Sequence, residues 1–224
     1  MSLHRSQHRQ YLGAVTWILF VFVLASGGTH SSLAAAIPAA TLNAQQPGTT
    51  LVFYAPQMNA DLWPALFQTL RGDLADGGGD LPDGLVLDKA PLLVRGDQDL
   101  RGVTFSRVIT VKLLARCDAF SQTSHSSEKG PLGWVLQISG NVQPFVSIDC
   151  ARIAEVLRPA TAGWTKQRRQ DAMLQAITHV LIHEWSHIVT QSSAHGSRGI
   201  TQANLSVSDL IKEPVNTHFS ARIH

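Results

Sequence analysis

Residues 179–195, HVLIHEWSHIVTQSSAH, are the stretch of sequence around which the rest of this chain is organised. On a helix, the apolar residues between 176 and 189 would occupy nearly all sides, and a helix that is apolar all round is a buried helix. Thr165 is a suitable residue to cap its start. We therefore predict a buried helix over about 166–191. Three residues of a different chemical kind stand inside its apolar part: His183, Glu184 and His187.

The spacing of these three residues is typical of a metal site. His183 and His187 are four residues apart, so on a helix they lie on one face and both imidazoles can reach a single ion. Glu184 projects beside that ion, within reach of a water bound to it. The helical pattern H-E-x-x-H is the signature of zinc peptidases for this geometric reason. A metal ion also offsets the cost of burying such groups without partners.

A catalytic zinc ion takes three protein ligands and leaves one position for water. The best candidate for the third ligand is His195, which lies eight residues after His187. The segment between them is small and polar, so the chain can turn back, and Gly196 and Gly199 keep that turn pliable. His179 continues the same helix face, but it lies too far along the helix to share the ion, so we expect it to pack beside the site.

This region resembles the zincin metallopeptidases. Residues 179–200 are similar to small, exported, metzincin-like bacterial peptidases, and the similarity extends more weakly to 132–150 and 203–211. The resemblance implies an α+β, zincin-like fold with a small mixed or antiparallel sheet, a buried active-site helix and a substrate groove beside an edge strand. It also implies three zinc ligands and one general base: His183, His187 and His195, with Glu184.

The sequence departs from the main zincin branches at three positions. Metzincins place their third histidine six residues after the second, with a glycine between, whereas here the gap is eight and Thr190 occupies the glycine position. Thr201 stands where many relatives have a methionine turn. Leu205 stands where gluzincins have a glutamate ligand, and a leucine cannot bind zinc. Asp209 and Glu213 are the alternative oxygen ligands.

These features predict an exported zinc-dependent metallopeptidase, a hydrolase in which Glu184 takes a proton from the attacking water and passes it to the leaving amine. A further donor would stabilise the oxyanion, and Arg198 and His218 are candidates for it. The alternative is a catalytically inactive zinc-binding relative with a binding or structural role. A metal hydrolase that acts on another bond is a third interpretation. Glu184 favours catalysis, because a structural zinc site does not need it.

The N-terminus has the order of an export signal. Arg5 and Arg9 precede an apolar run over 11–25, and small residues follow up to Ala36. We expect residues 1–36 to be a signal peptide and the protein to be secreted or periplasmic. The alternative is an uncleaved membrane anchor, although the apolar run is short for a membrane span.

The composition indicates one globular domain after this segment. The chain has 224 residues, 44% of them hydrophobic and 15% charged. We expect a flexible lead-in over 37–50 and a single catalytic domain over 51–224. Basic and acidic residues are balanced outside the N-terminal segment, which gives no case for nucleic-acid binding. The expected partner is therefore a peptide or protein substrate, and we expect a monomer.

Shorter patterns predict the remaining elements. We expect strands over 51–54, 85–87, 107–116, 134–138 and 142–150, helices over 61–74 and 151–157, and loops over 88–103 and 121–130. Gly140-Asn141 is a two-residue hairpin signal. Pro144 suits an edge strand, and Pro159 is expected to stop the second helix. Cys117 and Cys150 could form one disulfide in an oxidising compartment or remain buried thiols.

Overall fold

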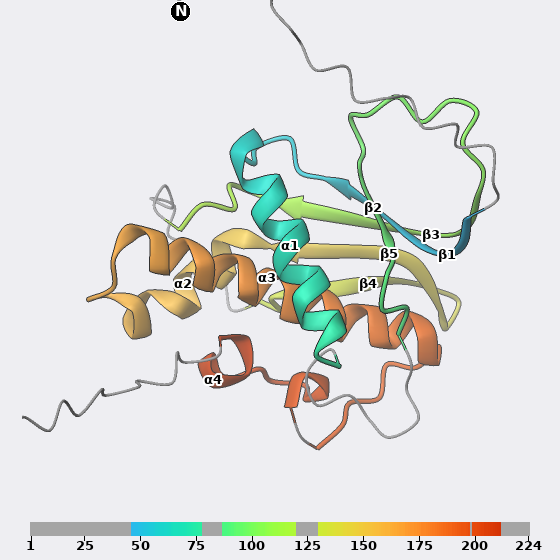
Figure 1. Ribbon diagram of the computed structural model, residues 1–224. Helices are drawn as coiled ribbons and strands as arrows, with labels where there is room; N and C mark the ends of the chain where they lie inside the picture. Colours follow the sequence, from blue (N-terminus) through green and yellow to red (C-terminus); the bar gives the residue numbers. More distant parts are fainter. Residues whose placement is uncertain (1–45, 78–86, 120–129, 198, 212–224) are drawn as a thin grey trace, which may run out of the picture. The chain divides into compact units, whose positions relative to one another are not determined.

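The computed structural model describes residues 46–77, 87–119, 130–197 and 199–211. These residues build one five-stranded sheet whose helices pack against one face (Figure 1). No helix in these ranges is long and apolar enough to cross a membrane. The elements are, in chain order, β1 (Gln46–Tyr54), η1 (Ala60–Leu62), α1 (Trp63–Ala75), β2 (Leu92–Arg95), β3 (Phe105–Leu114), β4 (Gly133–Ile138), β5 (Asn141–Asp149), α2 (Cys150–Thr161), α3 (Lys166–Thr190), η2 (Gly199–Thr201) and α4 (Val207–Leu210).

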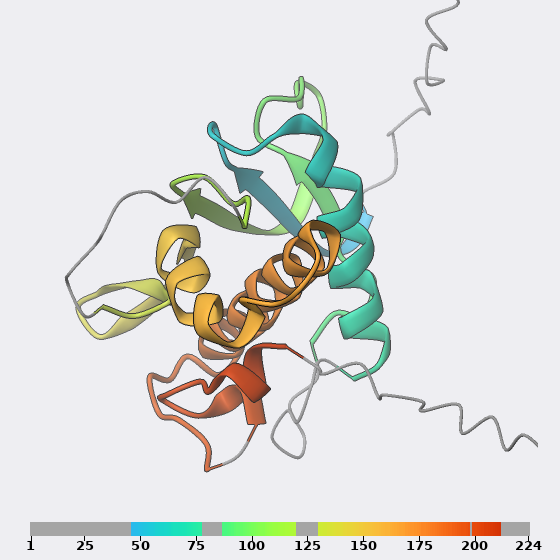
Figure 2. The same cartoon turned by 90° about the vertical axis from the view of Figure 1, so that its left-hand side faces the viewer.

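The sheet is mixed, with strand order β2-β1-β3-β5-β4. Strand β1 pairs in parallel with β2 and β3, and β3 pairs in parallel with β5. Strand β4 pairs antiparallel with β5 and forms one edge. Figure 2 looks toward the carboxyl ends of the parallel strands, with α1, α2 and α3 on one side of them. This arrangement confirms the predicted α+β class with a mixed sheet and a buried central helix.

Two predictions for the N-terminal half were wrong. Residues 46–50 belong to β1 instead of a flexible lead-in, and β2 lies inside the expected loop over 88–103. Both segments are held by parallel pairing with strands distant in sequence, and local composition does not report such pairing. Leu87 is buried but lies outside any strand, and residues 85–86 of that predicted strand lie outside the described residues. Most of the predicted loop over 121–130 also lies outside them.

The predicted hairpin is present, but its turn is shifted by one residue. Ser139 and Gly140 have φ values of 51° and 82°, and Ile138 pairs with Asn141 across the turn. Two successive positive φ values are typical of the tight hairpin turn that matches the twist of the strands, and this explains the glycine.

Two prolines stand where the sequence did not predict them. Pro144 lies in β5, which is flanked by β3 and β4 and so is not an edge strand. It is tolerated because pairing with β3 begins one residue later, at Phe145, and the pairing with β4 is irregular nearby. Pro159 lies inside α2, which continues to Thr161. The proline falls in the last turn, where Leu157 and Thr161 are buried, so packing holds the helix beyond it.

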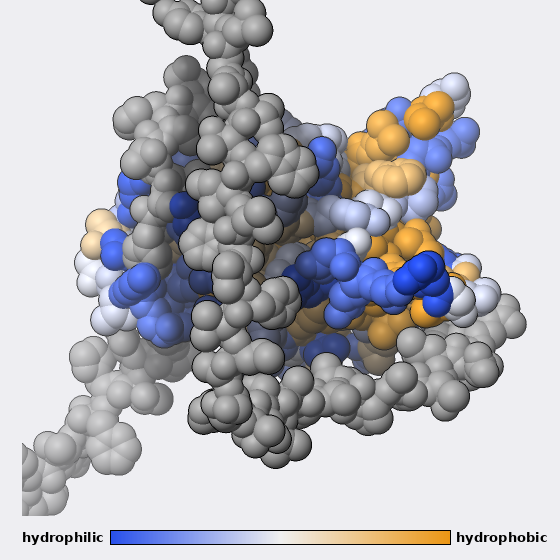
Figure 3. All heavy atoms as spheres, turned by 90° about the horizontal axis from the view of Figure 1, so that it is seen from above, coloured by the Kyte–Doolittle hydropathy of each residue, from blue (hydrophilic) through white to orange (hydrophobic). Residues whose placement is uncertain are grey.

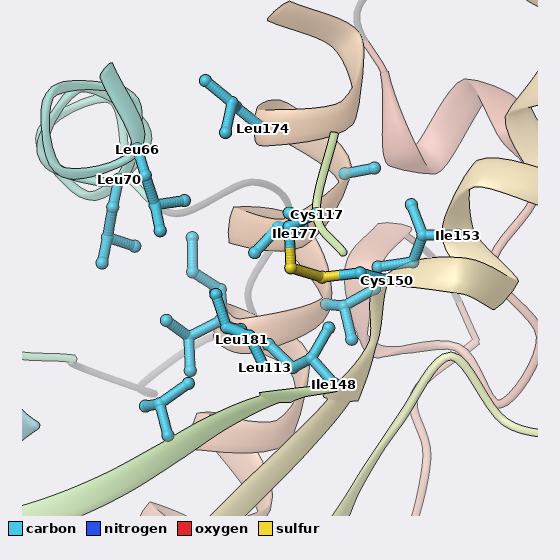
Figure 4. Close-up of a cluster of buried hydrophobic side chains, with 14 of the residues drawn as sticks. Leu66, Leu70, Leu113, Cys117, Ile148, Cys150, Ile153, Leu174, Ile177 and Leu181 are labelled. Carbon is cyan, nitrogen blue, oxygen red and sulfur yellow. A yellow bond between two sulfur atoms is a disulfide. The ribbon is translucent and has the colours of Figure 1, made fainter. Parts of the chain in front are cut away.

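The hydrophobic core fills the space between the sheet and the helices. Figure 4 shows leucines of α1, strand residues of β3 and β5, and apolar residues of α3 converging on it. The disulfide between Cys117 and Cys150 lies in this core with both residues fully buried, which confirms the predicted bond over the free-thiol alternative. It connects the segment after β3 to the first residue of α2.

Several large apolar side chains are exposed on the β4–β5 hairpin and on the sheet face that points away from the helices. Figure 3 shows hydrophobic surface, in orange, at the upper right, where this hairpin lies. The exposed residues of this region are Val108, Trp134, Leu136, Ile138 and Phe145.

We predict that the disulfide contributes substantially to stability. Replacing Cys117 and Cys150 together with alanine removes a cross-link between residues 33 positions apart. The unfolded chain then gains entropy, and the free energy of unfolding should fall by about 3–4 kcal/mol, measured by urea unfolding. The wild-type protein with reductant present should show a similar fall. A loss below about 1 kcal/mol in both experiments would contradict this role.

Candidate metal centre

Helix α3 begins and ends close to the predicted positions. The Thr165 side chain accepts a hydrogen bond from the Arg168 N–H, and Gln191 closes the helix in the left-handed conformation. Every residue from Ala176 to His187 is buried, and Trp185 lies in the core as predicted. The helix therefore carries its polar residues into the interior.

His183 and His187 are held by backbone carbonyls on their Nδ1 side. The Nδ1 atom of His187 lies 2.7 Å from the Ser192 carbonyl oxygen, and that of His183 hydrogen-bonds the Ile200 carbonyl. The two Nε2 atoms are turned toward each other, 3.2 Å apart, and the rings are nearly perpendicular. Each ring is therefore oriented by a contact made on the side away from its neighbour.

These carbonyl contacts decide which nitrogen of each ring carries the proton. A carbonyl oxygen can only accept, so Nδ1 must be the donor in His183 and in His187. In neutral rings Nε2 then carries a lone pair, and two lone pairs that face each other at this distance need a cation between or beside them. A tetrahedral ion with bonds of about 2.0–2.1 Å separates two ligand nitrogens by about 3.3 Å. The residues present therefore fit a metal ion.

Burial keeps both rings neutral, and only neutral imidazole can bind a metal ion. It lowers the pKa of His183 to about 4, although the hydrogen bond to Ile200 opposes the shift. It also lowers the pKa of His187, opposed by the hydrogen bond to Ser192. Desolvation disfavours the charged form in both cases.

His195 completes the group. Its ring stacks against His183 with a centroid separation of 5.3 Å and meets His187 at 4.9 Å. One potential ligand atom from each of these three histidines lies within 4.8 Å of the others. The structure thus brings the three predicted ligands together, with His195 exposed and the other two buried.

The loop after α3 is closed on itself by Gly196. The N–H of Gly196 donates to the Thr201 carbonyl at 2.9 Å, and a Cβ at this position would lie only 2.2 Å from the Thr201 Oγ1 atom. A Cβ at this position would displace the Thr201 side chain, so a glycine fits here without a shift. The Gly196–Thr201 hydrogen bond holds together the His195 and Ile200 segments of the site.

Glu184 lies beside the histidines in a buried position. Its Oε1 atom is 4.0 Å from the His183 Nε2 atom, and burial raises the pKa of its carboxyl group to about 7. A cation held by the histidines would lower that pKa again, because positive charge favours the carboxylate. With such a cation in place the group is therefore a carboxylate at neutral pH and can accept a proton.

A cleft of about 320 Å³ opens onto these side chains. Edge strand β4 forms one wall, and Leu132, Val180 and Leu205 add apolar surface. Gly133 allows the strand to approach α3, since a Cβ there would come within 2.5 Å of a Val180 methyl group. The zincin resemblance implied a groove beside an edge strand, and this cleft lies beside edge strand β4. The close approach that Gly133 allows was not predicted from the sequence.

Of the other residues named from the sequence, the described ones do not join the cluster. His179 packs beside it, with Nδ1 2.6 Å from the Asp209 carbonyl oxygen and Nε2 3.6 Å from the Asp73 carboxylate. The Asp209 carboxylate accepts from the N–H of Ser206 and caps α4. Three further residues named from the sequence lie outside the described residues: Arg198, Glu213 and His218.

No protein family, no curated protein and no solved structure matches this chain. The case for the site therefore depends on its own geometry.

We predict unequal effects of the two flanking histidines on metal affinity. His195→Ala removes a ring of the convergent cluster and should weaken zinc binding at least about tenfold, since loss of a residue that merely supports a metal ligand can reach that size. His179→Ala, the control in α3 one turn before His183, should change it much less. Competition with a chromophoric chelator measures both affinities, and equal effects would refute the ligand assignment.

We also predict that Gly133 is required for packing. Gly133→Ala places a methyl group against Val180 and should lower the free energy of unfolding by about 1–3 kcal/mol. Gly130→Ala is the control, because a Cβ there meets nothing within 4 Å. Chemical denaturation compares the two, and equal stabilities would show that β4 can move away from the helix.

Proposed function

We propose that this protein is a zinc-dependent peptidase of the zincin type. The observation that carries the proposal is that the Nε2 atoms of His183 and His187 lie 3.2 Å apart. In each ring the proton is on Nδ1, which donates to a backbone carbonyl, so Nε2 carries a lone pair. His195 adds a third imidazole, and Glu184 adds a buried carboxylate. This is the residue set that hydrolytic zinc sites use.

The donor set favours a transition metal such as zinc over magnesium and calcium. Three neutral imidazoles suit zinc, copper, iron and nickel, whereas magnesium and calcium require oxygen ligands. Catalytic zinc sites commonly have three protein ligands. His195 is on the exposed side of the cluster, which supports a site that opens toward the cleft.

The proposed mechanism assigns one main task to Glu184. Zinc, when bound, supplies positive charge that polarises the substrate carbonyl and makes water acidic. The Glu184 carboxylate accepts a proton from the attacking water and donates it to the leaving amine nitrogen. Its burial keeps bulk water away from the proton, and its position on the same helix turn as His183 maintains its distance from the reacting atoms.

The form of the cleft supports a peptide as substrate. Among the described strands β4 pairs with β5 alone, and Gly133, Trp134, Val135 and Gln137 line the cleft. An extended peptide can hydrogen-bond to such an edge, as in other complexes in which a strand is added to a sheet. We propose that the substrate lies along β4 with its scissile carbonyl at the histidines.

The disulfide supports an exported protein. Structural disulfides persist in oxidising compartments and are rare in the cytosol, so the Cys117–Cys150 bond accords with the export signal expected at residues 1–36. We propose a secreted or periplasmic location.

The decisive experiment separates metal binding from hydrolysis. Glu184→Ala should keep about one zinc per chain, because the three imidazoles remain, yet lose at least about a hundredfold in the rate of peptide cleavage. Zinc content is measured by elemental analysis and cleavage with a broad peptide library. Adding a chelator to the wild type should abolish cleavage, and adding zinc should restore it.

Ser186→Ala is the matched control, because Ser186 lies in the same buried turn and its hydroxyl donates to the His183 carbonyl. It should retain zinc and most of the activity. If wild type and Glu184→Ala bind zinc but are equally inert on the library, the protein is a zinc-binding relative without catalysis.

A further inference from the structure

A second cavity lies at the sheet edge opposite β4, where β1 and β2 end. Its volume is about 560 Å³. Strand β5 lies between the strands that line it and the edge strand of the histidine cleft. Its lining includes Phe53 and Tyr54 at the end of β1, Trp63 of α1, Arg95 at the end of β2, and Lys112 of β3.

The chain topology produces a crevice at this point. Strand β1 continues into α1, which lies on the helix-covered face of the sheet. The connection over 96–104, from β2 to β3, passes over the opposite face (Figure 2). Neighbouring parallel strands whose connections leave toward opposite faces open a crevice at their carboxyl ends, and ligands of open α/β sheets bind there.

Aromatic side chains that pack against each other and against Gly96 form the wall of this cavity. Phe53 and Trp63 pack edge to face with ring centroids 6.1 Å apart. The Tyr54 ring is 46% exposed and lies against Gly96, where a Cβ would come within 2.4 Å of it. The Gly96 N–H donates to the Phe53 carbonyl at 2.7 Å, which joins the two strand ends.

The charges around the cavity are mainly positive. Arg95 lies over the Trp63 ring, 5.4 Å from its centroid, and forms an ion pair with Asp97, the one acidic side chain among the lining residues. The ammonium group of Lys112 has no hydrogen bond or ion pair with any described residue, although its backbone pairs with β1 and β5. The lining therefore retains one uncompensated ammonium group beside an aromatic surface.

We propose that this cavity binds an aromatic carboxylate, with the ring against Tyr54 and Trp63 and the carboxylate paired with Lys112. Aromatic side chains supply a large apolar contact at low entropic cost, and a charge-assisted hydrogen bond orients the ligand. The same chemistry occurs in a free aromatic acid and in the C-terminal residue of a peptide. This inference does not depend on the proposed peptidase function.

The test uses the full-length protein and two probes, phenylacetate and the peptide Ala-Ala-Phe with a free C-terminus. Backbone amide shifts in nuclear magnetic resonance spectra should change at Gly96 and the end of β1 with either probe, and with phenylacetate they should not change around His195. Binding of phenylacetate alone would identify a free acid as the ligand, and binding of both would show that the cavity also accepts the C-terminal residue of a peptide.

The charge contact is tested with matched variants. Lys112→Met should weaken phenylacetate binding about fivefold, the size expected for one partly exposed ion pair. Lys89→Met, an exposed lysine that does not line the cavity, should leave the affinity unchanged. Phenylacetamide, which lacks the charge, should bind more weakly than phenylacetate to the wild type.

Three results would overturn the proposal: no shifts at the cavity with either probe, equal binding of the amide and the acid, or equal affinities of the Lys112 and Lys89 variants. Gly96→Ala gives an independent check, because the new methyl group must displace the Tyr54 ring and should weaken binding.

Discussion

The organisation of this protein depends on two neutral imidazoles that are oriented by carbonyl oxygens from another segment of the chain. His183 and His187 lie on a fully buried turn, and their Nδ1 atoms are engaged by Ile200 and Ser192. The contacts fix the tautomer of each ring and leave both Nε2 lone pairs facing the same point. Burial lowers the pKa of both rings, so they stay neutral and their lone pairs are available to a metal ion.

The rest of the fold supports this arrangement from two sides. The sheet and α1 cover α3, so that its central turns are removed from water. The loop after α3 is closed by the contact between Gly196 and Thr201, which positions both the Ile200 carbonyl and His195. On the other side, Gly133 lets β4 approach the helix near Glu184 and form the cleft wall.

Main-chain carbonyls make the loop's contacts at the turn after His195. Thr201 stands where many zincins have a methionine, yet the Thr201 carbonyl accepts the Gly196 N–H and the neighbouring Ile200 carbonyl accepts from His183. Backbone groups make both contacts, so the side chain at 201 does not decide whether they form. This accords with the proposed zincin-type function despite the altered sequence.

Several features were predictable from the sequence because their causes are local. The apolar run around His183 required a buried helix, the four-residue spacing placed two imidazoles on one face, and two cysteines in an apolar chain allowed one bond. Other features depend on contacts between distant segments. Strand β2 forms only because β1 pairs with it, and Pro144 is tolerated because of where pairing with β3 begins. The carbonyl partners of the histidines also come from the tertiary structure, because every residue has a carbonyl and the folded chain alone determines which one reaches the ring.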